Sequence, residues 1–201
     1  MISSIENFRD KSICVMGLGY VGLPLALLLA DIGFKVLGIE IRDEVLEKLQ
    51  KGEPHFFEPG LREGLKKAIR EGNIIFSKHI PLEANVSVYI VTVGTPLDEK
   101  KQVRLDMITN VSQEISEHLK EDDLVILRST VKIGTTRETV MPILAKSSKN
   151  FDLAFCPERI LEGQALKDLR ELPQIIGGVN LKSAIRAAQF FQFITPTVIK
   201  V

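Results

Sequence analysis

The chain has few of the residues that metal sites and disulfide frameworks require, and it has no excess of charge of either sign. Its 201 residues include two cysteines and three histidines, and 26 basic side chains balance 26 acidic ones. Cys14 and Cys156 make neither a C-x-x-C pair nor a disulfide framework, so a reducing cytoplasm is the expected location. Because the formal net charge is zero, no overall field recruits nucleic acid or an acidic membrane surface.

Long apolar runs and leader features are also missing. The longest apolar run, residues 23–30, is too short to cross a bilayer. Residues 1–10 have neither the basic nor the apolar region of a secretory signal. His55, His79 and His118 have no cysteine or paired acid at ligand spacing, and we expect no metal site. The sequence therefore predicts no nucleic-acid, membrane or metal partner.

Strand and helix patterns alternate along the whole chain. Residues 86–93 are nearly all apolar, which indicates a strand buried on both faces in a parallel sheet covered by helices. The alternation predicts an α/β fold with a doubly wound, mostly parallel sheet and right-handed crossovers. Asp43 is expected to cap a helix. Phe190, Phe191 and Phe193 are expected in the core, or on a face that a further helix covers. The predicted strands are residues 12–16, 35–41, 74–76, 86–93, 124–127, 151–155, 174–176 and 197–201, and the predicted helices are residues 20–32, 43–51, 61–71, 106–119, 135–145 and 181–191.

The most informative stretch is Gly17-Leu18-Gly19-Tyr20-Val21-Gly22, between an apolar strand and a Leu/Ala-rich helix. In that context a G-x-G-x-x-G pattern predicts a dinucleotide site. Gly17 is expected to make the tight turn, Gly19 to let a pyrophosphate approach the backbone, and Gly22 to let helix and strand pack closely. The free N–H groups and the dipole of the first helical turn favour a diphosphate.

Glu40 lies 18 residues after Gly22, at the expected end of the second strand. An acid there accepts hydrogen bonds from both hydroxyls of an adenine ribose and repels a 2′-phosphate, which favours NAD over NADP. Arg42 weakens this preference, because a nearby arginine accommodates the phosphate. The alternative role of Glu40 is that of a solvated strand end.

Three further segments follow predicted strands and carry hydroxyl, acidic or basic groups. Doubly wound sheets bind ligands at the carboxyl ends of their strands, so these segments are expected to line the same site. They are residues 93–96 (Val-Gly-Thr-Pro), 128–131 (Arg-Ser-Thr-Val) and 156–159 (Cys-Pro-Glu-Arg).

These motifs, in this order, resemble those of the nucleotide-sugar dehydrogenases, which are the UDP-glucose, GDP-mannose and UDP-N-acetylhexosamine 6-dehydrogenases. The resemblance covers essentially the whole chain, and Pro-Glu-Arg at 157–159 is most similar to the UDP-N-acetylmannosamine branch. The residues that carry it are G-L-G-Y-V-G-L-P at 17–24, E-P-G-L at 58–61, V-G-T-P at 93–96, S-T-V at 129–131, C-P-E-R-I-L-E-G at 156–163 and I-I-G-G at 175–178.

The resemblance implies a Rossmann-like NAD-binding domain and a twofold oxidation of the sugar C6 hydroxyl to a carboxylate, with two NAD consumed. The intermediate aldehyde is held as a cysteine thiohemiacetal and then a thioester. By that similarity NAD is bound by Gly17, Gly19, Tyr20, Val21, Gly22, Glu40, Thr95 and Thr130. Thr130 also positions a catalytic water, and Glu158 is an acid/base group that contacts substrate together with Arg159, Ile160 and Leu161. Glu162 matches a second acid of the UDP-glucose branch, at a position that is often proline in the hexosamine branch.

The family's nucleophilic cysteine lies in a C-terminal half, and its catalytic lysine and asparagine lie on a central helix. Neither Cys14 nor Cys156 is at the nucleophile position. We therefore expect residues 1–201 to be one NAD-binding domain, with a core at 1–127 and an α/β extension at 128–201 that carries part of the active site. We expect no meaningful turnover by this chain alone. Family members dimerise through the central helix, so a monomer is expected here.

Two rival interpretations remain open. One is a stand-alone NAD-sensing module without chemistry, for which Glu158 and Arg159 would have no use. The other is a dehydrogenase of the 6-phosphogluconate or hydroxyacyl-CoA kind, which shares the glycine turn and lacks the Pro-Glu-Arg segment. Retention of that segment argues against both.

Overall fold

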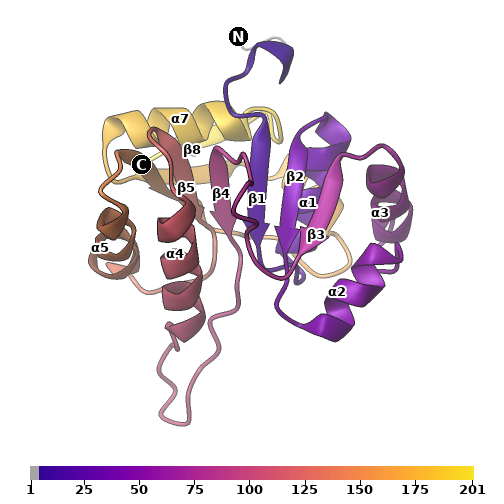
Figure 1. Ribbon diagram of the computed structural model, residues 1–201, viewed down its shortest axis with the longest axis horizontal. Helices are drawn as coiled ribbons and strands as arrows, with labels where there is room; N and C mark the ends of the chain where they lie inside the picture. Colours follow the sequence, from indigo (N-terminus) through magenta and orange to yellow (C-terminus); the bar gives the residue numbers. More distant parts are fainter. Residues whose placement is uncertain (1–4) are drawn as a thin grey trace.

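One eight-stranded sheet forms the centre of the structure, a computed structural model that describes residues 5–201 (Figure 1). Its strands are β1 (Ser12–Met16), β2 (Lys35–Ile39), β3 (Ile74–Ser77), β4 (Val88–Val91), β5 (Asp123–Leu127), β6 (Phe151–Phe155), β7 (Gln174–Gly178) and β8 (Val198–Lys200). They lie in the order β3-β2-β1-β4-β5-β6-β7-β8. Neighbours pair in parallel except for β6 and β7, which are antiparallel. The doubly wound, mostly parallel sheet is thus confirmed.

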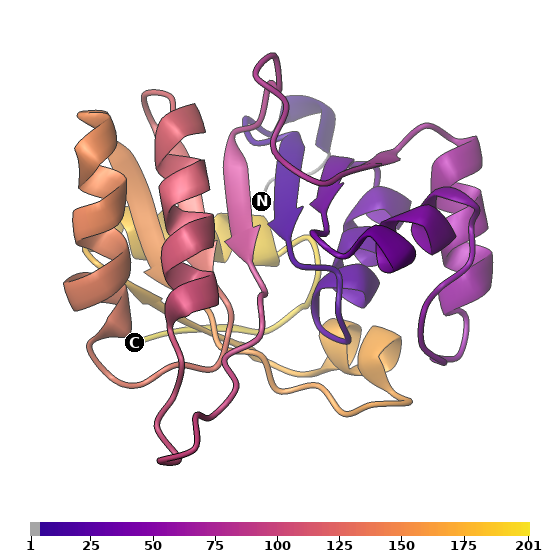
Figure 2. The ribbon, with the colours of Figure 1, turned by 60° about the horizontal axis from the view of Figure 1, so that its bottom comes forward.

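Helices cover both faces of this sheet. One face carries α1 (Gly22–Ile32), α3 (Leu61–Arg70) and α7 (Leu181–Phe191), and the other carries α4 (Asp106–His118) and α5 (Met141–Leu144) (Figures 1 and 2). Successive strand residues point to opposite faces, and in β1 both sets are buried. Ile13 and Val15 pack toward α1, whereas Cys14 and Met16 pack toward α4. Burial on both faces explains the continuous apolar strands.

Several local predictions differ from the structure. Helix α1 begins at Gly22 rather than at residue 20, and Asp43 is the first residue of α2 (Asp43–Gln50) without capping it. The helix predicted over 135–145 is a π-helical turn (Thr136–Val140), the short α5 and a 3-10 turn (Ala145–Ser147). Pro142 has no N–H to donate, so a regular α-helix cannot run through it. Helix α6 (Ala165–Glu171) and a 3-10 turn at Ile5–Asn7 escaped prediction, and β2 and β4 are shorter than predicted.

The three C-terminal phenylalanines belong to the core. Phe190 and Phe191 are fully buried, and Phe193 is partly buried against the same cluster. The ring of Phe193 lies 4.8 Å from that of Phe8 and 5.5 Å from that of Phe34. The core alternative of the prediction is confirmed, because residues from before β1 already cover this face.

A buried ion cluster joins the segment just before β1 to strand β6 and helix α7. Arg186 of α7 donates to both carboxylate oxygens of Asp10, at 3.0 and 2.7 Å, and to Asp152 of β6 at 3.0 Å. Ser183 completes the cluster with a 3.1 Å bond to Asp152. Hydrogen bonding to the two carboxylates outweighs desolvation and raises the pKa of Arg186.

The prediction about a leader concerns residues 1–10, of which the first four lie outside the described residues. Within residues 5–201, no helix combines the length and the apolar character needed to cross a bilayer.

Candidate cofactor and substrate site

The glycine turn after β1 has the geometry that its three glycines predict. Gly17 has a φ of 97°, in the left-handed region, and its N–H donates to the Ile39 carbonyl at 2.9 Å. A Cβ at Gly22 would overlap the Gly17 carbonyl oxygen and lie 2.6 Å from Thr92 Oγ1. At Gly19 a Cβ would meet nothing within 4 Å. The turn is therefore closed where the backbone packs on itself and open at Gly19, where a pyrophosphate would approach.

Glu40 follows β2 directly, and 5% of the residue is exposed. Its carboxylate accepts hydrogen bonds from the backbone N–H of Leu18, at 3.3 Å, and from the backbone and guanidinium of Arg42, at 2.9–3.1 Å. Glu40 is thus a buried, fixed acid beside the glycine turn and not a solvated strand end.

Tyr20 and Val21 lie within the glycine turn. The Tyr20 ring packs against Phe56 with 4.2 Å between ring centroids, and 46% of Tyr20 is exposed. Phe56 comes from the loop between α2 and α3. Its contact with Tyr20 joins that loop to the turn.

The segments after β4 and β5 are bonded to each other. Thr95 Oγ1 donates to the Thr130 carbonyl at 2.6 Å, and Ser129 Oγ donates to the Val93 carbonyl at 2.7 Å. The side chain of Thr130, which follows β5, is exposed. These two threonines, predicted from separate motifs, are neighbours in space.

Glu158, after β6, is held by backbone N–H groups and by a buried arginine. Its Oε1 accepts from the N–H of Arg159 at 2.6 Å and from that of Ile160 at 3.1 Å. Its Oε2 pairs with Arg128, whose side chain is 2% exposed. Arg128 also donates to Gln174 Oε1 at 2.7 Å, and its guanidinium lies 5.1 Å from the centroid of the Phe191 ring. The carboxylate therefore has one defined orientation.

The loops after β1, β2, β4, β5 and β6 all leave the same edge of the sheet, at the bottom of Figures 1 and 2. That edge thus carries the glycine turn, Glu40, the Thr95–Thr130 pair and Glu158.

Comparison with known proteins identifies the family. The model of the UDP-glucose/GDP-mannose dehydrogenase family, NAD binding domain, matches residues 11–195. The chain belongs to this family. NAD is the cofactor of this domain. The open backbone at Gly19 and the buried acid at Glu40 are the features expected of an NAD site. The relation to 6-phosphogluconate or hydroxyacyl-CoA dehydrogenases is thereby set aside.

The relatives similar to this chain include several nucleotide-sugar dehydrogenases. A UDP-N-acetyl-D-mannosamine dehydrogenase of Methanococcus aeolicus is 41% identical over 184 residues, which cover 90% of this chain and 41% of the relative. The solved UDP-D-ManNAc dehydrogenase of Pyrococcus horikoshii is 31% identical with a TM-score of 0.89, over 94% of this chain and 46% of that one. The GDP-mannose dehydrogenase of Pseudomonas aeruginosa is 26% identical with a TM-score of 0.86, over 94% and 45%. The chain spans a little under half the length of these family members.

The family's expected sugar-contacting residues differ in exposure. Arg159 is exposed and donates to the Pro173 carbonyl. Ile160 packs against the core, whereas Leu161 is 65% exposed. Glu162 is exposed and has no bond to the other site residues among those described. Of the three expected contact residues, Ile160 is the one whose side chain packs into the core, while the side chains of Arg159 and Leu161 are exposed.

Glu58 has a role that the sequence analysis missed. It is 5% exposed, and its two oxygens accept the backbone N–H groups of Gly163 and Ala165 at 2.7 and 2.8 Å. Ala165 begins α6, so Glu58 caps that helix from a distant loop and fixes the segment after Glu158. The E-P-G-L motif was the available signal, but its partner lies more than a hundred residues away.

Neither thiol is available for chemistry. Cys14 and Cys156 are fully buried. Burial raises the pKa of Cys14 well above its usual range and that of Cys156 to about 12. Both are core residues.

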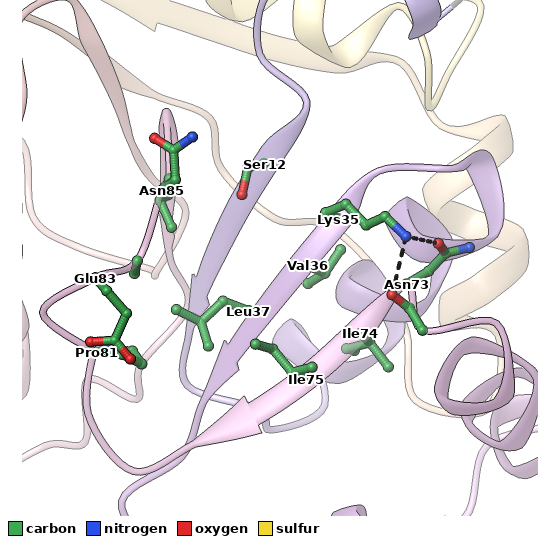
Figure 3. A pocket seen from close by; sticks show the side chains of 13 residues that line it. Ser12, Lys35, Val36, Leu37, Asn73, Ile74, Ile75, Pro81, Glu83 and Asn85 are labelled. Carbon is green, nitrogen blue, oxygen red and sulfur yellow. Dashed lines mark hydrogen bonds between the residues drawn. The ribbon is translucent and has the colours of Figure 1, made fainter.

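A separate cavity of about 310 Å³ lies at the opposite edge of the sheet, where β1, β2 and β3 begin (Figure 3). Leu37, Ile75 and Val86 supply apolar walls, and Lys35 Nζ donates to Asn73 Oδ1 at 2.9 Å. None of the predicted site residues lines it. Across the described residues, no three His, Cys, Asp or Glu side chains gather closely enough to hold a metal ion.

Proposed function

We propose that this chain is the cofactor half of a dehydrogenase that oxidises the C6 hydroxyl of a UDP-N-acetylhexosamine to a carboxylate with two NAD⁺. The observation that carries the proposal is the grouping of the glycine turn, Glu40 and Glu158 at one sheet edge. The relatives from M. aeolicus and P. horikoshii bear the name of the UDP-N-acetylmannosamine enzyme, which favours that sugar.

Each predicted site residue has a task in this proposal. Bound NAD supplies the hydride acceptor, and the protein holds and orients it and moves protons. Glu158 takes the proton of the hydroxyl or of the hydrolytic water. Thr130 positions that water, and Arg159, Ile160 and Leu161 contact the sugar nucleotide. NAD is held by Gly17, Gly19, Tyr20, Val21, Gly22, Glu40, Thr95 and Thr130.

We further propose that residues 1–201 form one domain, with a core at 1–127 and an extension at 128–201, and that it does not turn over alone. Support comes from the two inaccessible thiols, Cys14 and Cys156. Losing a covalent nucleophile reduces the rate by on the order of 10⁴–10⁶. We expect a monomer, and a stable dimer in sedimentation would contradict this.

Calorimetric titration with NAD tests the cofactor site. Gly19→Ala should weaken binding strongly without lowering thermal stability, because the added Cβ meets no protein atom but occupies the approach of the pyrophosphate. Gly64→Ala is the matched control, since Gly64 lies in α3 away from the site. Equal NAD affinity in the two variants would overturn the cofactor site.

The reaction itself is tested by joining residues 11–195 to the remainder of the M. aeolicus relative. We expect NADH formation with UDP-N-acetylmannosamine, lost in Glu158→Gln while NAD binding persists. A hybrid that folds and binds NAD but oxidises no UDP-sugar would favour the NAD-sensing module instead.

A further inference from the structure

The carboxylate of Glu40 is fully engaged by protein donors. Its Oε1 accepts from the backbone N–H of Arg42 at 3.1 Å and from Arg42 Nε at 2.9 Å. Its Oε2 accepts from Arg42 Nη2 at 3.0 Å and from the Leu18 N–H at 3.3 Å. Arg42 thus grips the carboxylate with a two-pronged guanidinium contact, on the atoms that the hydroxyls of a ribose would need.

The two partners differ in freedom. The Glu40 side chain is 5% exposed and fixed by Leu18, whereas the Arg42 side chain is 50% exposed. Burial pushes the pKa of Glu40 upward, but hydrogen bonds from Arg42 more than offset it, so the pKa falls below its usual value and the carboxylate stays charged. When a ligand takes the carboxylate, Arg42 is the partner that can move.

We propose that Arg42 is a specificity residue held in reserve: it releases Glu40 to the ribose hydroxyls of NAD, and it binds a 2′-phosphate only when the charge of Glu40 is removed. This rests on the proposed role of Glu40. With Glu40 present, a 2′-phosphate meets a fixed negative charge, and Nε and Nη2 of Arg42 are bonded to that carboxylate. Without that charge, the same guanidinium offers a free fork that matches a phosphate in geometry.

The inference predicts gain of a new ligand from a single substitution. Glu40→Gln keeps an acceptor for the Leu18 N–H while removing the charge, and Glu40→Ala removes both. In either variant NADP should bind at least roughly tenfold more tightly than in the wild type, and NAD roughly tenfold more weakly, each equivalent to about 1.4 kcal/mol. If NAD affinity falls without any gain in NADP affinity, Arg42 does not bind the 2′-phosphate.

The experiment is calorimetric titration of this chain with NAD and with NADP at fixed salt. The proteins are the wild type, Glu40→Gln, Glu40→Ala, Arg42→Ala and Glu40→Gln/Arg42→Ala. Arg42→Ala should bind NAD up to roughly fivefold more tightly, because an ion pair whose arginine is half exposed, worth about 1 kcal/mol, no longer has to open. The double variant should lose the gain in NADP affinity. Arg62→Ala is the control, since Arg62 is likewise exposed and paired with an acid, Glu53.

The outcomes separate the two proposals. If the double variant binds NADP as tightly as Glu40→Gln, Arg42 plays no part and the inference falls, while the NAD site stands. A wild type that prefers NADP would overturn it as well. If neither dinucleotide binds any of the folded proteins, the cofactor site and the inference both fall. Thermal melts establish which variants are folded.

Discussion

Removing the guanidinium of Arg128 should destabilise the fold more than any surface change. Arg128→Met keeps the aliphatic part of the side chain but deletes the guanidinium, which lies over the Phe191 ring and forms the ion pair with Glu158. It also deletes the bonds to the Cys156 carbonyl, at 3.2 Å, and to Gln174, at 2.7 Å. All of these groups lie at the junction of β5, β6 and β7.

The size of the expected loss of stability follows from how deeply this ion pair is buried. Only 2% of the Arg128 side chain and 10% of the Glu158 side chain are exposed. Deleting one partner of such a pair costs about 3–5 kcal/mol, because the other charge stays buried. Glu158 retains the N–H groups of Arg159 and Ile160, so we expect the low end, about 3 kcal/mol. For a chain of this size the melting midpoint then falls by roughly 6–12 °C.

Differential scanning calorimetry measures this directly. Arg104→Met is the control: its ion pair with Asp106 lies on the surface, and its midpoint should not change. Adding Glu158→Gln to Arg128→Met should restore more than about 1 kcal/mol, because the uncompensated charge is gone. A drop of less than about 2 °C in Arg128→Met, or no recovery in the double variant, would refute the role of the buried pair.

Three further predictions concern other buried or paired groups. Glu58→Gln should lower the free energy of unfolding in urea by about 1–3 kcal/mol, because one backbone N–H at the start of α6 loses its acceptor; an unchanged midpoint would rule this out. Cys14 and Cys156 should resist iodoacetamide in the native chain at mildly alkaline pH and react fully in denaturant; a native adduct in the mass spectrum would contradict their burial. A hydrogen bond from Lys67 lowers the pKa of Asp31, so its stabilisation is present above the unfolded-state pKa and lost as the pH falls through the folded-state pKa. Asp31→Asn should therefore be less stable than wild type at neutral pH and equally stable in acid. The same difference in stability at both pH values would count against the pairing.

Features encoded locally could be predicted from the sequence. The apolar strands, the glycine turn and the position of Glu40 depend on neighbours within one strand–turn–helix unit, and their main features are present in the structure. The helix boundary was misplaced by two residues, because Tyr20 and Val21 look helical in composition yet form the turn that precedes α1.

Features that depend on distant partners could not be predicted. The burial of Arg128 depends on Glu158, Gln174 and Phe191, which come from three other elements. Helix α6 has only seven residues, and its start is stabilised by Glu58 from a loop before α3. A window of sequence around either element contains no trace of its partner.

Two carboxylates therefore control the segment expected to contact substrate. Glu158 accepts the N–H groups at its beginning, and Glu58 accepts those of Gly163 and Ala165 at its end. If Glu158 also moves a proton, its substitution changes chemistry and loop geometry together. Glu158→Gln retains an oxygen for the N–H groups of Arg159 and Ile160, whereas Glu158→Ala releases them. When both variants are made in the hybrid with the M. aeolicus relative, a loss of activity common to them is chemical. Any further loss of sugar-nucleotide affinity in Glu158→Ala alone measures the structural part.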